Sequence, residues 1–204
     1  MPLETMLVFA ATVLPIVCTP GPDILFISAQ GLSGRTSQAL RATLGVLAGY
    51  VAHAVLSALG VAAVVAASPV LFEVLRWVGV AYLVYLAGQM IRSALRSHGQ
   101  SFRADADGSA LFRRGFLTSF LNPKGLMVYF AILPNFMTPS LGIALQALTL
   151  SSIFIGMCAV MYSIVAVSVA SMGRRGSFSE RRRRCVEGTA GGLLVFAASQ
   201  LALG

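Results

Sequence analysis

Apolar stretches about as long as a bilayer is thick dominate this sequence and restrict the folds open to it. Hydrophobic residues make up 57% of the 204 residues and charged residues only 11%. A transmembrane helix needs about 20 apolar residues, and the chain offers six such stretches. They are predicted at 3–31, 40–66, 70–91, 115–137, 141–172 and 186–203. The sequence therefore predicts an all-α integral membrane protein folded as a six-span helix bundle.

The first and fourth predicted spans are interrupted by helix-breaking residues. Each interruption contains proline and one charge: Pro20, Gly21, Pro22 and Asp23 in the first span, and Asn122, Pro123 and Lys124 in the fourth. A charged side chain at the bilayer centre costs roughly 2.5 to 3.5 kcal/mol on insertion scales, so charges there usually have a function. Breaks at corresponding positions of two halves indicate the binding site of a transporter.

Each break is predicted to start a new half-helix. Asn is a favoured N-cap and Pro suits the first helical position, so residues 21–22 and 122–123 both have the pattern of a helix start. The positive end of a helix favours the Asp23 carboxylate, for which a purely capping role is the alternative, but disfavours the Lys124 cation. We therefore interpret Lys124 as part of an anion site, for Asp23 itself or for a substrate carboxylate.

The two breaks also indicate an internal repeat. Placing Pro22 on Pro123 puts Asp23 on Lys124, and residues 83–89 resemble residues 194–200. Repeats at about 1–95 and 110–204 would each contain three spans, an odd number, so the two copies would cross the membrane in opposite directions. The chain, residues 1–204, is thus predicted to be a single transporter domain of two inverted three-helix repeats with broken first and fourth helices.

The basic residues predict the orientation of the chain. Its formal net charge is +8, and every Lys and Arg except Arg76 and Lys124 lies in or beside the loops after spans one, three and five. The longest of these loops is predicted at residues 93–114. Basic loops favour the cytoplasm, so both termini are expected outside. No aromatic residues are interleaved with the arginines, so we expect no nucleic-acid partner.

His53 is a further candidate, in the middle of the second predicted span. It could relay protons or it could pack with a hydrogen bond, and the sequence leaves both roles open. In the same span, Gly45 and Gly49 have the spacing that permits close approach of helix backbones. We expect them to pack inside one bundle, with a homodimer interface as the alternative. The sequence indicates no cofactor, no metal site and no enzymatic activity.

Three segments together resemble the LysE/RhtB family of bacterial amino-acid exporters. They are the two breaks, at 20–23 and 122–124, and the run Gly-Val-Ala-Tyr-Leu-Val-Tyr-Leu-Ala-Gly at 79–88, and the resemblance covers essentially the whole chain. It implies export of a small amino acid or derivative, such as homoserine, threonine or leucine, by proton antiport across the bacterial inner membrane. Asp23 would then face the substrate ammonium and Lys124 its carboxylate, and Asp23 would take up a proton when the substrate leaves. An Asp23–Lys124 pair broken by substrate is the alternative.

Two other functions stay open at this point. A membrane thiol-disulfide oxidoreductase would need a cysteine at each helix break. Cys18 lies four residues before Pro22, but the equivalent residue before Pro123 is Ser119, so the required pair is missing. A passive channel is the other alternative, because sequence alone does not separate a channel from a carrier.

Overall fold

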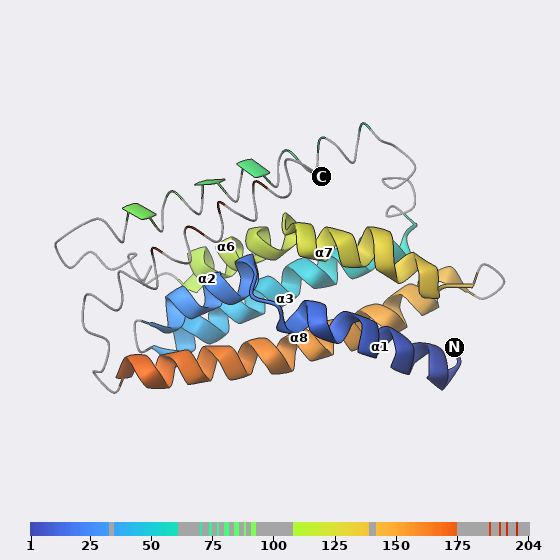
Figure 1. Ribbon diagram of the computed structural model, residues 1–204, viewed down its shortest axis with the longest axis horizontal. Coiled ribbons are helices and arrows are strands. Elements are labelled where there is room, and N and C mark those ends of the chain that lie inside the picture. The colour runs from blue at the N-terminus through green and yellow to red at the C-terminus, as the bar shows by residue number, and fades with distance from the viewer. Residues whose placement is uncertain are drawn as a thin grey trace.

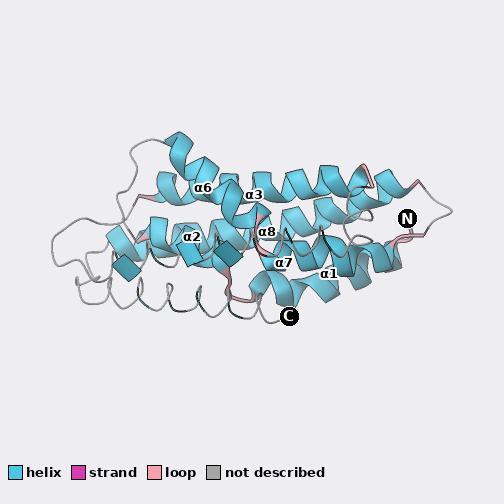
Figure 2. Cartoon of the chain, turned by 90° about the horizontal axis from the view of Figure 1, so that it is seen from above, coloured by secondary structure: helices cyan, strands magenta, loops and turns pink. Residues whose placement is uncertain are grey.

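The computed structural model describes residues 1–32, 35–60, 108–138 and 142–174, with single positions between 70 and 92 and between 188 and 199. Within these residues every regular element is a helix (Figures 1 and 2). The elements are α1 (Leu3–Cys18), α2 (Pro22–Gly31), α3 (Thr36–Ala58), α6 (Gly108–Phe120), α7 (Pro123–Met127), the π-helical turn η1 (Val128–Ile132), the 3-10 turn η2 (Leu133–Phe136) and α8 (Ile143–Arg174). The predicted helical fold is thus confirmed. The third and sixth predicted spans, 70–91 and 186–203, lie outside the described residues apart from those single positions.

Some of the described helices are long and apolar enough to cross a membrane, alone or as bent pairs. Helices α3 and α8 each reach that length alone. The first and fourth predicted spans are bent pairs, with an angle of 53° between α1 and α2 and of 49° between α6 and the segment Lys124–Phe136. The protein is therefore a multi-pass membrane protein, with up to four spans in the part of the chain described here.

The two bent spans run in opposite directions along the molecule (Figure 1). Helix α2, the second half of the first span, packs against α6, the first half of the fourth, and α1 contacts η2 at the far end of the fourth. Both breaks lie near the middle of the molecule. This antiparallel arrangement is the one that inverted repeats require, while the complete three-helix repeat stays a prediction.

Two predicted boundaries were wrong. The second span was expected to continue to residue 66, but α3 ends at Ala58 because Gly60 has a positive φ of 76° and its N–H bonds the carbonyl of Ser57. A glycine in this conformation is a common helix stop. The predicted loop at 93–114 is helical from Gly108, because the start of α6 packs on α3 and buries Leu111 completely. Tertiary packing there overrides a polar composition.

Glycines bring α3 and α6 into direct backbone contact. A Cβ added to Gly45 would lie 2.2 Å from the carbonyl oxygen of Phe112, and one added to Gly115 would lie 2.5 Å from that of Ala42. A Cβ on Gly49 would lie 2.8 Å from the carbonyl oxygen of Phe116. The prediction that Gly45 and Gly49 pack inside one bundle is thus confirmed.

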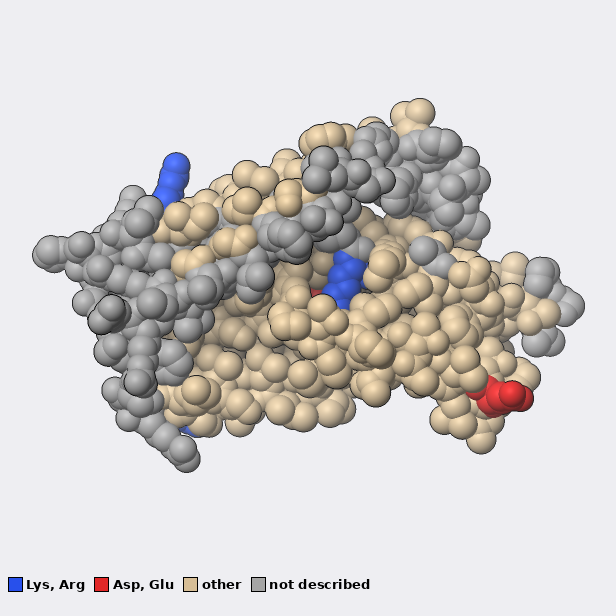
Figure 3. Space-filling view, viewed as in Figure 1, with Lys and Arg blue, Asp and Glu red and all other residues tan. Residues whose placement is uncertain are grey.

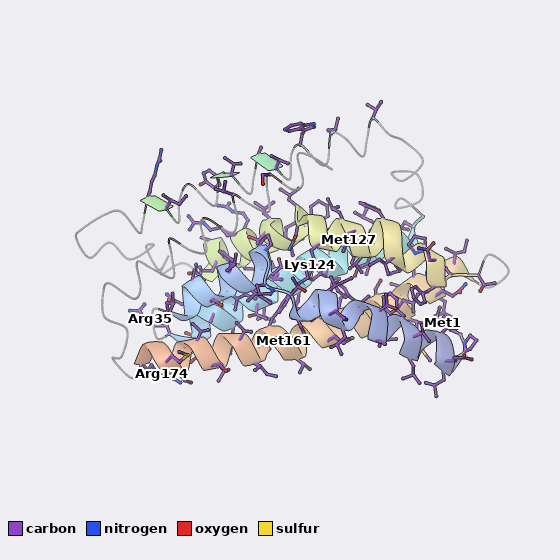
Figure 4. All side chains as sticks on the ribbon, in the orientation of Figure 1. Met1, Arg35, Lys124, Met127, Met161 and Arg174 are labelled. Carbon is purple, nitrogen blue, oxygen red and sulfur yellow. The ribbon has the colours of Figure 1, made fainter. Side chains whose placement is uncertain are left out.

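The basic residues next to the described helices lie at one end of the bundle. Figure 4 places Arg35 and Arg174 together at the end opposite Met1. The Arg174 guanidinium donates to the Thr36 hydroxyl at 2.9 Å, which joins the C-terminal end of α8 to the start of α3. The start of α6 lies at the same end, since a Cβ on Gly108 would touch the Arg41 guanidinium. The starts of α3 and α6 and the C-terminal end of α8 therefore lie at one end of the bundle, while the orientation of the loops stays a prediction.

Candidate functional site

Both breaks have the local structure that their residues predict. Gly21 is the N-cap of α2 in an extended conformation, and Pro22 follows at the first helical position. Asn122 is the N-cap of α7, with Pro123 after it, and its side-chain oxygen Oδ1 accepts a hydrogen bond from the Lys124 backbone N–H at 3.0 Å. Helix α1 has already ended at Cys18, and Pro20 lies exposed in the turn between the two half-helices.

The two breaks touch one another. A Cβ on Gly21 would lie 3.8 Å from Cδ of Lys124. The Lys124 ammonium reaches past Gly21 to the end of α1, where it donates to the backbone carbonyls of Thr19 at 3.0 Å and Val17 at 3.4 Å. Figure 3 shows a cationic side chain in the middle of this face with a small acidic patch beside it, and Figure 4 labels Lys124 at that place.

This contact gives Lys124 a structural partner. The last carbonyl groups of a helix have no partner within the helix, and the C-terminal end of a helix carries a partial negative charge. Lys124 is unfavourable at the positive end of its own helix α7, but its side chain neutralises the negative end of α1. The carbonyl groups at a break in a membrane helix must find a donor inside the protein, and Lys124 supplies it.

Asp23 lies at the centre of the bundle with only 1% of its surface exposed. Its oxygen Oδ2 accepts hydrogen bonds from the hydroxyls of Tyr50 on α3 and Tyr162 on α8, the latter at 3.1 Å. Its other oxygen, Oδ1, is buried and has no hydrogen-bond partner among the described residues by distance and angle. The carboxylate is therefore held on one side by two donors from different helices, and the Asn122 side chain also lies within interaction range of it.

Asp23 and Lys124 do not form an ion pair. The two charges are within electrostatic range of each other, but the described partners of the Asp23 carboxylate are tyrosine hydroxyls and those of Lys124 are backbone carbonyls. The alternative in which the two charges pair directly is thus not the arrangement of this structure.

Tyr50 connects the two breaks. Its hydroxyl donates to Asp23 beside the first break, while its ring lies against Gly125 just after the second, where an added Cβ would come within 2.9 Å of Tyr50 Cε1. The Tyr50 backbone carbonyl accepts a hydrogen bond from the Tyr129 hydroxyl of η1 at 3.1 Å, and the ring packs edge-on against Phe154 at 5.0 Å. A fully buried residue with this many partners has little freedom to move independently of either break.

His53 lies one turn further along α3 and is built into the packing. Its Nε2 is 3.0 Å from the backbone carbonyl of Phe120, the last residue of α6. Its ring is stacked between Phe120 and Tyr129, with centroid distances of 4.8 and 5.2 Å. These contacts fit the packing role that the sequence left open, and a proton-relay role stays a prediction.

Comparison with known proteins identifies the kind of protein that carries this site. The sequence profile of the family described as "LysE type translocator" matches residues 14–204. The chain belongs to this family. It is therefore a membrane translocator, and the resemblance predicted from the two breaks is confirmed.

Individual relatives agree with the family assignment. The chain is similar to a leucine efflux protein of Klebsiella pneumoniae, with 31% identity over 75% of this chain and 74% of the relative. It is also similar to uncharacterised membrane proteins of Vibrio cholerae (30% identity; 69% and 68% of the two chains) and Pseudomonas aeruginosa (28% identity; 87% and 84%). No solved structure matches the chain.

Tyr50 and Tyr162 are the residues of the candidate site that the sequence analysis missed. Both lie in the middle of apolar spans and are completely buried. A buried tyrosine hydroxyl usually needs a hydrogen-bond partner, so a polar partner could have been predicted for each of these two residues. The sequence alone did not show that both hydroxyls reach the same carboxylate, since Tyr50 and Tyr162 are far apart along the chain.

Removing the Tyr50 hydroxyl tests whether it positions Asp23. We expect Tyr50→Phe to lower transport about tenfold, because a hydrogen bond to a charged group contributes about 1.5 kcal/mol or more and 1.4 kcal/mol corresponds to a factor of ten. The ring and its packing remain, so the protein should insert and purify normally. Transport by the reconstituted protein is compared with that of Tyr85→Phe, which changes a tyrosine that is 58% exposed. Equal transport by the two variants would contradict a positioning role.

Proposed function

We propose that the protein exports a small amino acid or derivative, such as leucine, threonine or homoserine, from the cytoplasm by proton antiport. One observation carries the proposal: a buried carboxylate with an unpartnered oxygen lies where two broken helices meet, in a chain of a translocator family. The relative from Klebsiella pneumoniae is named as a leucine efflux protein, which supports leucine as the first substrate to test.

Asp23 is the group that recognises the substrate ammonium. Its Oδ1 has no hydrogen-bond partner of ordinary geometry in the part of the chain that the structure describes, and an ammonium group is a donor with the opposite charge. The carboxylate of the same substrate needs a donor nearby, and the second break brings both Asn122 and Lys124 to this region. The ammonium group of an amino acid would thus face the first break and its carboxylate the second.

The same carboxylate provides a step for proton coupling. An ionised carboxyl group in an apolar interior is unfavourable unless a partner compensates its charge. While the substrate is bound, its ammonium compensates Asp23. When the substrate leaves, Asp23 takes up a proton, and it must release that proton before the next substrate binds. One proton then moves inward for each amino acid that moves outward.

The proposed setting is the bacterial inner membrane, with the basic loops in the cytoplasm and both termini outside. The common position of Arg35, Arg41 and Arg174 at one end of the bundle supports this orientation, because basic segments are retained on the cytoplasmic side. We further propose that the chain is one domain of two inverted repeats, about 1–95 and 110–204. The antiparallel bent spans and their matching Pro-containing helix starts support it.

Counterflow in proteoliposomes tests the proposal against a passive channel. Vesicles are loaded with unlabelled leucine and diluted into a trace of labelled leucine, without any ion gradient. A carrier is expected to accumulate the label transiently above its outside concentration. Each site that releases unlabelled leucine outside returns to the inside either empty or with a labelled molecule. A pH gradient, acidic outside, should then drive net export.

The outcomes separate the alternatives. Simple equilibration of the label without an overshoot would indicate a channel. No movement of leucine, threonine or homoserine by correctly inserted protein would contradict the proposed substrate class. Counterflow that is normal but insensitive to pH would contradict the antiport alone.

A further inference from the structure

The end of α1 presents backbone carbonyl groups that the helix itself cannot saturate. The helix ends at Cys18, and Pro20 and Pro22, which follow, have no backbone N–H. Two of the donors that a continuing helix would supply are thus missing at the break. The carbonyls of Val17 and Thr19 instead both accept hydrogen bonds from one ammonium group, at 3.4 and 3.0 Å. Two carbonyl oxygens that converge on a single ammonium form a small cation site.

The ammonium in this site belongs to Lys124, which lies 105 residues further along the chain than Thr19. Lys124 is in the first turn of α7, where the positive end of that helix disfavours a cation. Its stem passes Gly21, where an added Cβ would lie 3.8 Å from Lys124 Cδ. The side chain therefore leaves its own helix and binds at the negative end of α1. In chemical terms its ammonium is a ligand of α1 that is covalently attached to another helix.

A cation at this site also lies near a buried negative charge. Asp23 is almost fully buried and within electrostatic range of the Lys124 ammonium. An ionised carboxyl group in an apolar interior is unfavourable unless a nearby charge compensates it. The site can be reached from outside, because Thr19 is exposed and the cationic side chain is visible on the molecular surface (Figures 3 and 4). A small cation from solution could therefore replace the ammonium if the Lys124 side chain were removed.

We propose that the end of α1 is a binding site for a primary ammonium group, that Lys124 is its built-in occupant, and that the protein therefore needs no metal cation at this break. In transporters with broken helices, carbonyl groups at the C-terminal end of a half-helix commonly coordinate a coupling cation such as Na⁺. Here an ammonium that cannot dissociate fills the equivalent position. The inference goes beyond the proposed function, since the site exists whichever amino acid is carried.

Lys124→Ala is the discriminating variant. It removes the ammonium and most of the methylene stem, so it leaves the carbonyls of Val17 and Thr19 without their donor and opens a space that suits a short alkylammonium ion. Lys124→Met is the matched control, because it also removes the charge but keeps that space filled. Ethylammonium is the probe. Tetramethylammonium has the same charge without any N–H donor and is the control ion.

The first readout is thermal melting in detergent at constant ionic strength, without substrate. We expect Lys124→Ala to melt roughly 3 to 6 °C below the wild-type protein, because the carbonyls lose a charged donor. Ethylammonium should raise the melting temperature of this variant in a saturable way, since a ligand that binds only the folded state stabilises it. It should not raise that of the wild-type protein or of Lys124→Met, and tetramethylammonium should stabilise none of the three.

The second readout is leucine counterflow, and this part of the test rests on the proposed function. No ion gradient is imposed, so passage of the neutral amine through the bilayer does not disturb the measurement. We expect Lys124→Ala to be about tenfold slower than the wild-type protein, the effect of one hydrogen bond to a charged group, and ethylammonium to restore much of the rate. Wild-type counterflow should be equal in sodium, potassium and choline chloride.

The contrary outcomes differ from one another. If ethylammonium leaves the melting temperature of Lys124→Ala unchanged, the end of α1 is not an ammonium site and the proposal is wrong. Equal stabilisation of Lys124→Met would place the added ion elsewhere and would also overturn it. Wild-type counterflow that requires sodium or potassium would refute the independence from metal cations. The absence of leucine counterflow in the wild-type protein would contradict the proposed function, while the melting experiment would still decide the ammonium site.

Discussion

Gradient-driven export is expected to fall by about tenfold to a hundredfold when Asp23 is changed to Asn. The substitution keeps the shape of the side chain but removes the charge that we propose binds the substrate ammonium, and a charge-assisted hydrogen bond contributes about 1.5–3 kcal/mol. Membrane insertion should stay normal, because removal of a buried charge eases insertion. Transport into proteoliposomes with an imposed pH gradient measures the loss.

The control variant for Asp23→Asn, and the result that would contradict the prediction, both involve changes of charged residues. Glu4→Gln removes an exposed carboxylate from the first turn of α1 and should leave export unchanged. If Asp23 and Lys124 formed only a structural ion pair, each single change would strand the other charge and lower the yield of protein. The double change Asp23→Asn with Lys124→Met would then restore both yield and export. Recovery in the double variant would therefore overturn the site.

The Gly45→Ala variant is expected to lose much of its stability, although Ala is the better helix former. The added Cβ would lie 2.2 Å from the backbone carbonyl of Phe112, and backbone cannot rotate away as a side chain can. Helices α3 and α6 must separate, and overpacking of this kind costs about 3 kcal/mol or more. For a chain of this size such a loss lowers the melting temperature by roughly 6 to 12 °C.

Gly156→Ala is the matched control for this prediction. Gly156 also lies inside a long helix, α8, but an added Cβ there meets nothing within 4 Å among the described residues. Alanine should therefore keep its ordinary helix advantage of about 1 kcal/mol and raise the melting temperature slightly. Opposite shifts in melting temperature for these two Gly→Ala substitutions would show that the effect at Gly45 comes from the contact between α3 and α6. A Gly45→Ala protein that melts like the wild type would show that α3 and α6 are not so close.

The features predicted well from the sequence are those set by local chemistry. Proline has no backbone N–H, and Asn and Gly are favoured at helix caps, so residues 20–23 and 122–124 determine where the helices break. The apolar length of α8 and the close-packing glycines of α3 are also local patterns. In each case the neighbouring residues alone decide the outcome.

The features that were missed depend on which helices are neighbours. The partners of Lys124 are backbone carbonyls more than 100 residues away, and the donors to Asp23 come from α3 and α8. A charge pattern indicated that Lys124 needs an anion, but a partial negative charge at a helix end meets that need as well. The start of α6 was missed for the same reason, because its stability comes from α3.

Lys124 holds the end of α1 through main-chain atoms, and this has a consequence for how the sequence can vary. Its acceptors are the carbonyl oxygens of Val17 and Thr19, which every amino acid possesses. A side chain at position 19 can therefore be exchanged without loss of the contact, provided that the chain keeps its path. Position 124 has less tolerance, since only a long side chain that ends in a cationic N–H donor can reach both oxygens. The contact between the two breaks thus depends on which residue occupies position 124. At positions 17 and 19 it depends only on the path of the backbone.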